Sequence, residues 1–104
     1  MDLIHTQSAL QEVGSRLTGA TALFVDTEFD SGRGGTDLCI LQISDGTTVY
    51  LIDALRLSSF EPLVPAFRSA DWVLHAGLQD VGLITRSLRL ETRPRSRCRP
   101  ARWR

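Results

Sequence analysis

Asp26 and Glu28 stand two residues apart at the end of an apolar run, and their types and spacing could hold a metal ion. Successive side chains of a β-strand point to opposite faces, so residues 26 and 28 would share one face and converge on one cation. Two carboxylates on a buried strand repel each other and lose hydration, so a positive charge between them would stabilise both. Carboxylate oxygens suit a hard cation, Mg²⁺ or Mn²⁺. The pair alone leaves an alternative open, in which the strand ends at Val25 and residues 26–30 form a solvated acidic loop.

The elements that would position this pair follow from the apolar pattern, which changes between strand and helix periods. Thr6 or Ser8 can cap a first helix that Gly19 ends, and Pro62 can open a short second helix. The predicted strands are residues 22–28, 38–43, 48–52 and 72–75, and a last helix spans about 78–88. A tight turn at Asp45-Gly46 would make the second and third strands antiparallel neighbours. This order predicts an α/β fold with a mixed sheet and flanking helices.

Length and composition predict one small domain. The chain has 104 residues, of which 42% are hydrophobic, enough for one modest core. It contains neither an apolar stretch of membrane-spanning length nor a signal-peptide pattern, so we expect it in the cytoplasm. Cys39 and Cys98 are the two cysteines, and no CxxC or Cys/His cluster occurs. This spacing argues against a zinc site and a disulfide framework, and both are expected to be free thiols.

The net charge of zero divides into two unequal parts. Residues 1–88 carry five arginines and eleven acidic residues, a net charge of −6, whereas residues 89–104 carry seven arginines and Glu91, a net charge of +6. Like charges without periodicity predict that residues 89–104 are disordered and add nothing to a core. The chain has no lysine, as is typical of a GC-rich gene, and one hypothesis is that these residues are translated out of frame. The other is a basic arm that binds nucleic-acid phosphates.

Three blocks of the sequence combine apolar strands with polar residues at their ends. They are Val25-Asp-Thr-Glu-Phe29, then Leu38-Cys-Ile-Leu-Gln-Ile-Ser-Asp-Gly46 with Leu51-Ile-Asp53, then Val73-Leu-His-Ala-Gly-Leu-Gln-Asp80. In this order the blocks resemble ribonuclease D, within the DEDD 3′-5′ exonucleases. The resemblance covers residues 1–88 and implies a ribonuclease H-like fold, a five-stranded sheet whose first three strands are antiparallel. Residues 1–88 would be the N-terminal portion of that domain, truncated before its last strand and helices.

The resemblance also implies two divalent metal ions, Mg²⁺ or Mn²⁺. Asp26 would bridge both ions, Glu28 would hold the ion that activates water, and Asp80 would hold the other. Two metal ions about 4 Å apart stabilise both the attacking and the leaving oxygen of a phosphoryl displacement. The implied reaction is the release of nucleotides from RNA 3′ ends, such as those of transfer RNA precursors.

The chain departs from the family pattern at the fourth carboxylate. That carboxylate comes from a Tyr-x-x-x-Asp block, but Tyr50 is the only tyrosine here and Ala54 stands four positions on. We therefore expect impaired activity in this 104-residue chain. One alternative is a catalytically inactive remnant that at most binds nucleic acid, and another is an unrelated small α/β binding module. Because the family sheet continues beyond its fourth strand, residues 72–75 would here expose an edge for self-association.

Four further residues have both a functional and a structural interpretation. Phe29 could stack on a terminal base or pack in the core. His75 could contact the substrate or act as a base, although a histidine at a strand end is more often structural. Asp53 is interpreted as a turn former. Gln42 needs a hydrogen-bond partner within its apolar strand and could brace the loop after Glu28.

Overall fold

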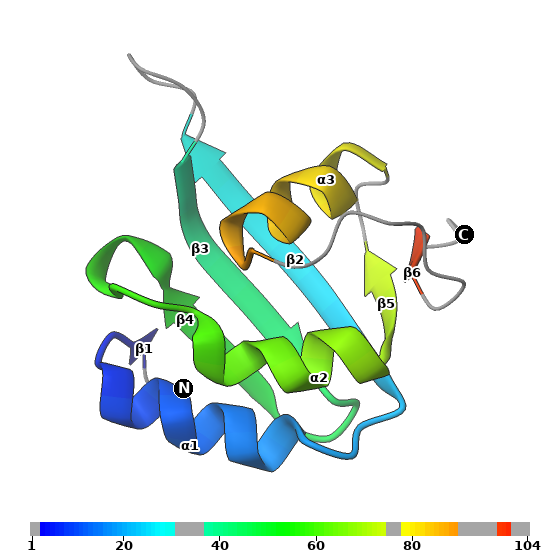
Figure 1. Ribbon diagram of the computed structural model, residues 1–104, viewed down its shortest axis with the longest axis horizontal. Helices are drawn as coiled ribbons and strands as arrows, with labels where there is room; N and C mark the ends of the chain where they lie inside the picture. Colours follow the sequence, from blue (N-terminus) through cyan, green and yellow to red (C-terminus); the bar gives the residue numbers. More distant parts are fainter. Residues whose placement is uncertain (1–2, 31–36, 75–77, 90–97, 101–104) are drawn as a thin grey trace.

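One mixed sheet organises the structure, a computed structural model that describes residues 3–30, 37–74, 78–89 and 98–100. For residues 78–81, 83 and 98–100 the backbone alone is described. The strands are β1 (Leu3–Ile4), β2 (Ala22–Asp30), β3 (Asp37–Ser44), β4 (Val49–Asp53), β5 (Asp71–Leu74) and β6 (Cys98–Pro100), in the order β1-β4-β3-β2-β5-β6 (Figure 1). β2, β3 and β4 are antiparallel neighbours, whereas β1, β5 and β6 pair in parallel. The predicted mixed sheet, with its first three predicted strands antiparallel, is confirmed.

The described helices gather on one face of this sheet (Figure 1). They are α1 (Gln7–Leu17), η1 (Ala54–Arg56), η2 (Glu61–Leu63), α2 (Val64–Ser69) and α3 (Leu78–Ser87). Of the two predicted caps Thr6 is used, since its Oγ1 accepts a hydrogen bond of 3.2 Å from the N–H of Ala9. Gly19 follows the end of α1 with φ 95°, a left-handed conformation that glycine adopts without strain. None of the described helices has the length and apolar character needed to cross a membrane.

The buried core lies between the helices and the near face of the sheet. On β2 the side chains of Leu23 and Val25 are buried, whereas Phe24 between them is 43% exposed. On the neighbouring β5, Val73 is 40% exposed and pairs with Phe24. The far face is therefore open in the part of the chain that the structure describes. The strand that was expected to be buried is therefore buried on one face, because α1, α2 and α3 all pack against the same side.

A β-bulge in β3 changes which residues reach the core. The register of β2 against β3 shifts between Glu28 and Phe29, which leaves Cys39 as an extra residue on β3. One extra residue reverses the alternation of the strand, so Leu38 and Leu41 both point toward the helices and both are buried. The Cys39 thiol is free, as predicted, and the side chain of Cys98 lies outside the described residues.

The C-terminal strand β6 contradicts two expectations, the disorder of residues 89–104 and the bare edge of β5. Cys98–Pro100 form β6, which pairs in parallel with β5 from Trp72 to Leu74, so the prediction of disorder is wrong for these three residues. The predicted bare edge on β5 is also wrong. An edge strand presents unpaired N–H and C=O groups, and the chain's own residues 98–100 pair with them. The proposed reason for self-association is thereby removed.

The turn between β3 and β4 consists of residues 45–48, one position later than the predicted connection at 44–47. Ser44 pairs with Val49, and only Gly46 among the turn residues has a positive φ, 96°. The Oδ1 atom of Asp45 accepts hydrogen bonds from the backbone N–H groups of Thr47 at 2.9 Å and Thr48 at 3.0 Å. The bonds from Thr48 and Thr47 lower the pKa of the Asp45 carboxyl from its ordinary value of 3.8.

We expect the Asp45→Asn variant to be less stable than the wild type at neutral pH, because the amide oxygen keeps an acceptor but loses the charge. A carboxyl with a lowered folded-state pKa adds stability above pH 3.8, and this stability is lost as the pH falls through the folded-state value. The difference in the free energy of unfolding between the two proteins should therefore shrink on acidification. Urea unfolding of both proteins at about pH 6 and about pH 3 measures this difference in the free energy of unfolding. A difference that is the same at both pH values would contradict the role of the charge.

Candidate functional site

Asp26 and Glu28 lie together on the open face of the sheet, as their spacing predicts. Both belong to β2, and both side chains are exposed. Same-face neighbours on a strand are about 7 Å apart along the chain, a span that carboxylates can close around one cation. The Oδ1 atom of Asp26 accepts a hydrogen bond of 3.0 Å from the N–H of Thr27. The alternative of a solvated loop after Val25 is excluded, because residues 26–30 continue the strand and pair with β3.

The position of Asp80 is described only through its backbone. Asp80 is the third residue of α3, which begins four residues after β5 ends at Leu74. Since β5 runs parallel to β2 and Leu74 pairs with Val25, β5 ends level with the residue before Asp26, and α3 begins four residues later. The Asp80 side chain and the whole of His75 lie outside the described residues. The convergence of three carboxylates therefore stays a prediction.

The structure separates the other candidates by the face they occupy. Phe29 is half-buried and packs against the core, which favours its structural interpretation. Asp53 precedes η1, but its side chain makes no capping hydrogen bond, so its turn-forming role does not rest on a cap. Gln42 is exposed on the open face and pairs with Asp26 across the strands. It therefore faces the carboxylate pair, and the loop after Glu28 that it was interpreted to brace lies outside the described residues.

The donor chemistry of the pair fits a hard divalent cation. Asp26 and Glu28 supply carboxylate oxygens on a face that water reaches freely, and Mg²⁺ typically keeps several waters while one or two carboxylates bind it. Among the residues whose side chains are described, no group of three or more His, Cys, Asp or Glu could hold a metal ion. The described side chains thus provide two ligands, and a third would have to come from Asp80.

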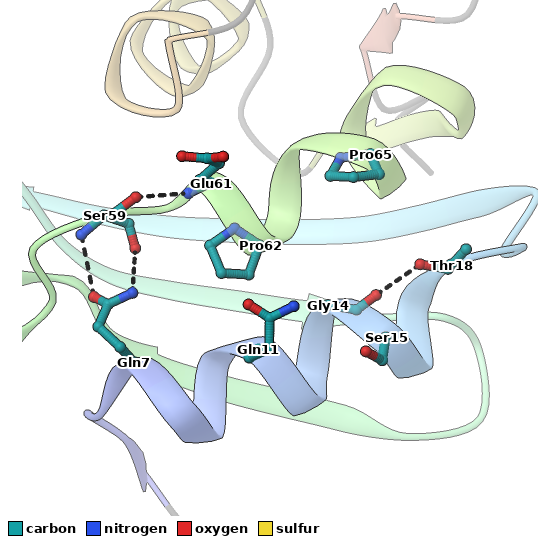
Figure 2. Close-up of a pocket in the computed structure, with 9 residues that line it drawn as sticks. All are labelled: Gln7, Gln11, Gly14, Ser15, Thr18, Ser59, Glu61, Pro62 and Pro65. Carbon is teal, nitrogen blue, oxygen red and sulfur yellow. Dashed lines mark hydrogen bonds between the residues drawn. The ribbon is translucent and has the colours of Figure 1, made fainter.

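Two grooves of the described chain lie away from the pair. One, of about 520 Å³, runs between α1 and residues 59–65 (Figure 2). The other, of about 680 Å³, lies between residues 58–68 and the end of α3. Neither is lined by Asp26 or Glu28. In the part of the chain that the structure describes, the candidate site is therefore a feature of the open sheet face, separate from these two grooves.

The first groove is closed at one end by Gln7. Its Oε1 accepts hydrogen bonds from the N–H groups of Ser58 and Ser59 at 2.9 and 3.1 Å, and its Nε2 donates to the carbonyl of Ser59 at 3.1 Å. Figure 2 shows this contact beside Gln11 and Pro62. These bonds hold residues 58–59 against α1, so Gln7 serves to fix the connection between η1 and η2.

Comparison with protein families gives one clear match. The family model described as 3′-5′ exonuclease matches residues 1–96. No curated protein sequence matches the chain significantly.

Solved structures with a similar fold are exonucleases. Escherichia coli RNase D, described as an exoribonuclease involved in structured RNA processing, is 30% identical with a TM-score of 0.70 over 82% of this chain. The catalytic core of RRP6 from Trypanosoma brucei is 24% identical, with a TM-score of 0.71. This match covers 85% of the present chain and 26% of the RRP6 chain. Trypanosoma brucei RNase D in complex with RNA U12 is 20% identical with a TM-score of 0.65, over 86% of this chain and 34% of its own. The last two matches support the fold alone.

The matches confirm the predicted fold class, an α/β ribonuclease H-like sheet with flanking helices. They also confirm the resemblance to ribonuclease D. The chain spans 24% of the length of the Escherichia coli RNase D chain.

Proposed function

The chain belongs to the 3′-5′ exonuclease family, and from this premise we propose that it provides the metal-binding part of a 3′-5′ exoribonuclease of the ribonuclease D type. The observation that carries the proposal is the pair Asp26 and Glu28, side by side on one exposed face of β2. The proposed substrates are RNA 3′ ends, including those of transfer RNA precursors. Support comes from two similar proteins, one described as acting in structured RNA processing and one solved with RNA.

The proposed mechanism assigns each carboxylate one task. Asp26 and Glu28 would hold two divalent ions, Mg²⁺ or Mn²⁺, together with Asp80. When bound, such ions supply electrostatic stabilisation of the attacking and the leaving oxygen at the phosphorus atom. The Thr27 N–H donates to Oδ1 of Asp26 and so fixes the orientation of that carboxylate. The pair thus provides negative charge and fixed ligand positions on a surface that an RNA end can approach.

We propose further that turnover by the 104-residue chain alone is impaired. Its sequence contains no Tyr-x-x-x-Asp block, so it supplies no fourth carboxylate of the DEDD pattern. A second candidate function, a remnant that binds nucleic acid without cutting it, is favoured by the seven arginines of residues 89–104. Each arginine that neutralises a phosphate releases counterions and makes binding salt-dependent.

Mn²⁺ titration of the whole chain tests the proposal. We expect Asp26→Asn and Glu28→Gln each to weaken Mn²⁺ binding by at least about tenfold, because each removes a charged ligand. Asp71→Asn is the matched control. Asp71 lies on β5 and pairs with Ala22, which stands four residues before Asp26 at the other end of β2. It should leave the affinity unchanged. Equal affinities of the wild type and the Asp26 variant would refute the site.

An RNA assay then separates the two candidate functions. Incubation with Mn²⁺ and a 3′-labelled RNA should give slow nucleotide release, or none, in the wild type. Release that Asp26→Asn abolishes would support exonuclease activity in this chain. Metal binding without release, together with salt-dependent RNA binding that is weakened by deleting residues 101–104, which carry two of the seven arginines, would support the non-cutting remnant.

A further inference from the structure

Gln42 occupies a place on the open face that folding does not explain. It lies in the centre of β3 between the buried side chains of Leu41 and Ile43, which point to the opposite face. Its own side chain is exposed and has no hydrogen-bond partner among the side chains and backbone groups that the structure describes. A polar amide at this position therefore adds nothing to the core and satisfies no buried group.

The sheet register places Gln42 directly beside Asp26. The two residues are paired across β2 and β3, and the Cβ atoms of such pairs lie about 4.5–5.5 Å apart. Glu28, one same-face position farther along β2, is a diagonal neighbour within reach of a long side chain. Gln42 is therefore close enough to contact either carboxylate of the pair.

Within its own row of the sheet Gln42 has one polar neighbour, whereas Asp53 lies diagonally from it on β4 as Glu28 does on β2. On the β4 side its register partner is Leu51, which in turn pairs with Leu3 of β1. Both are apolar, so neither side chain can accept a hydrogen bond from the amide. On the β2 side stands the Asp26 carboxylate, whose Oδ1 already accepts the Thr27 N–H. The acceptor that remains on this row of the sheet is the second carboxylate oxygen of Asp26.

We infer that Gln42 is a positioning residue of the proposed Asp26 and Glu28 metal site, an inference that rests on the proposed function. The structure contains no hydrogen bond between the Gln42 and Asp26 side chains, so the contact requires rotation of the exposed amide, which would bring its Nε2 to the Asp26 oxygen that Thr27 leaves free. With both oxygens hydrogen-bonded, the carboxylate plane would be fixed when a cation binds. A carboxylate oxygen has two lone pairs, so the oxygen that accepts from Gln42 can still bind the ion. Partners of this kind orient metal-binding carboxylates and raise metal affinity.

Two substitutions at position 42 should change metal affinity in opposite directions. Gln42→Leu keeps the size of the side chain but removes the donor, and Mn²⁺ binding should weaken about tenfold. Gln42→Glu puts a third carboxylate beside Asp26, and Mn²⁺ binding should tighten about tenfold because Mn²⁺ prefers oxygen ligands. Ser15→Glu adds the same charge at an exposed position on α1. This control should bind Mn²⁺ as the wild type does.

Calorimetric Mn²⁺ titration of the full chain distinguishes the possible failures. If Asp26→Asn weakens binding but both Gln42 variants match the wild type, the role of Gln42 is refuted and the proposed site stands. If the wild type does not bind Mn²⁺, or Asp26→Asn leaves binding unchanged, both fail. If Ser15→Glu tightens binding as much as Gln42→Glu does, the gain in Gln42→Glu is due to net charge, and a Gln42→Leu variant that binds Mn²⁺ as the wild type does would then refute the positioning role. Urea unfolding of each variant verifies that an exposed substitution has left the fold intact.

Discussion

Replacing Gly14 by alanine is expected to lower the free energy of unfolding by about 2–3 kcal/mol, although alanine is the better helix former. A Cβ atom at Gly14 would lie 2.2 Å from the carbonyl oxygen of Pro62 and 2.9 Å from its carbonyl carbon. Both are backbone atoms, so relief requires α1 and η2 to move apart. Figure 2 shows Gly14 facing Pro62 across the groove. Separation is opposed by Gln7, which binds the backbone of Ser58 and Ser59 just before η2.

Gly82→Ala is the matched control for this prediction. Gly82 also lies inside a helix, α3, but a Cβ atom there would meet nothing within 4 Å. Its substitution should therefore raise the free energy of unfolding by about 0.5–1 kcal/mol, the ordinary difference in helix propensity. Urea unfolding followed by circular dichroism measures both variants. A stabilising effect of Gly14→Ala would show that α1 and η2 are not in close contact in solution.

Gly14 also illustrates why part of the fold could not be predicted from the sequence. A glycine inside a helical pattern lowers confidence in the helix, and nothing in its local sequence reveals that Pro62, 48 positions away, approaches its backbone. The helix itself was predictable, because its apolar stripe and the Thr6 cap are local signals. The reason for its glycine is tertiary.

The strands show the same division between local and non-local signals. The apolar runs that became β2, β3, β4 and β5 were predicted to within two residues at each end, since long runs of strand-forming residues are strong signals. β1 has two residues and β6 three, and neither carries an apolar alternation. Both form because a neighbouring strand offers an unpaired edge. Such edges exist only after the rest of the sheet has assembled.

For the candidate site, the sequence was sufficient to predict that Asp26 and Glu28 share one face. It was not sufficient to predict their exposure or their neighbours on the adjacent strand. The two-residue period of a strand was sufficient to place Asp26 and Glu28 on one face. The exposure of these two side chains was not predictable, because it depends on which face of the sheet the helices cover. The position of Gln42 opposite Asp26 depends on the register of β2 against β3. That register includes a shift between Glu28 and Phe29, which no local pattern in the sequence indicates.

Trp72→Ala is expected to lower the free energy of unfolding by about 3–5 kcal/mol. The Trp72 side chain is only 4% exposed, and its ring meets the ring of Phe67 edge to face with centroids 5.2 Å apart. Its Nε1 donates a buried hydrogen bond of 2.7 Å to the carbonyl oxygen of Phe67. That carbonyl lies in the last turn of α2, where carbonyl groups have no partner within the helix. Trp72 therefore fills the core and also satisfies the end of α2.

Trp72→Phe separates these two roles, because it keeps an aromatic ring and removes the N–H donor. The Phe67 carbonyl would then be buried without a partner, at a cost of about 1–3 kcal/mol. Phe24→Leu, a substitution at the 43% exposed position on the open face, is the matched control and should change the free energy of unfolding by less than about 0.5 kcal/mol. Urea unfolding followed by far-ultraviolet circular dichroism gives all three values. If Trp72→Phe is as stable as the wild type, water or another donor replaces the indole at the end of α2, and the loss in Trp72→Ala is due to packing alone.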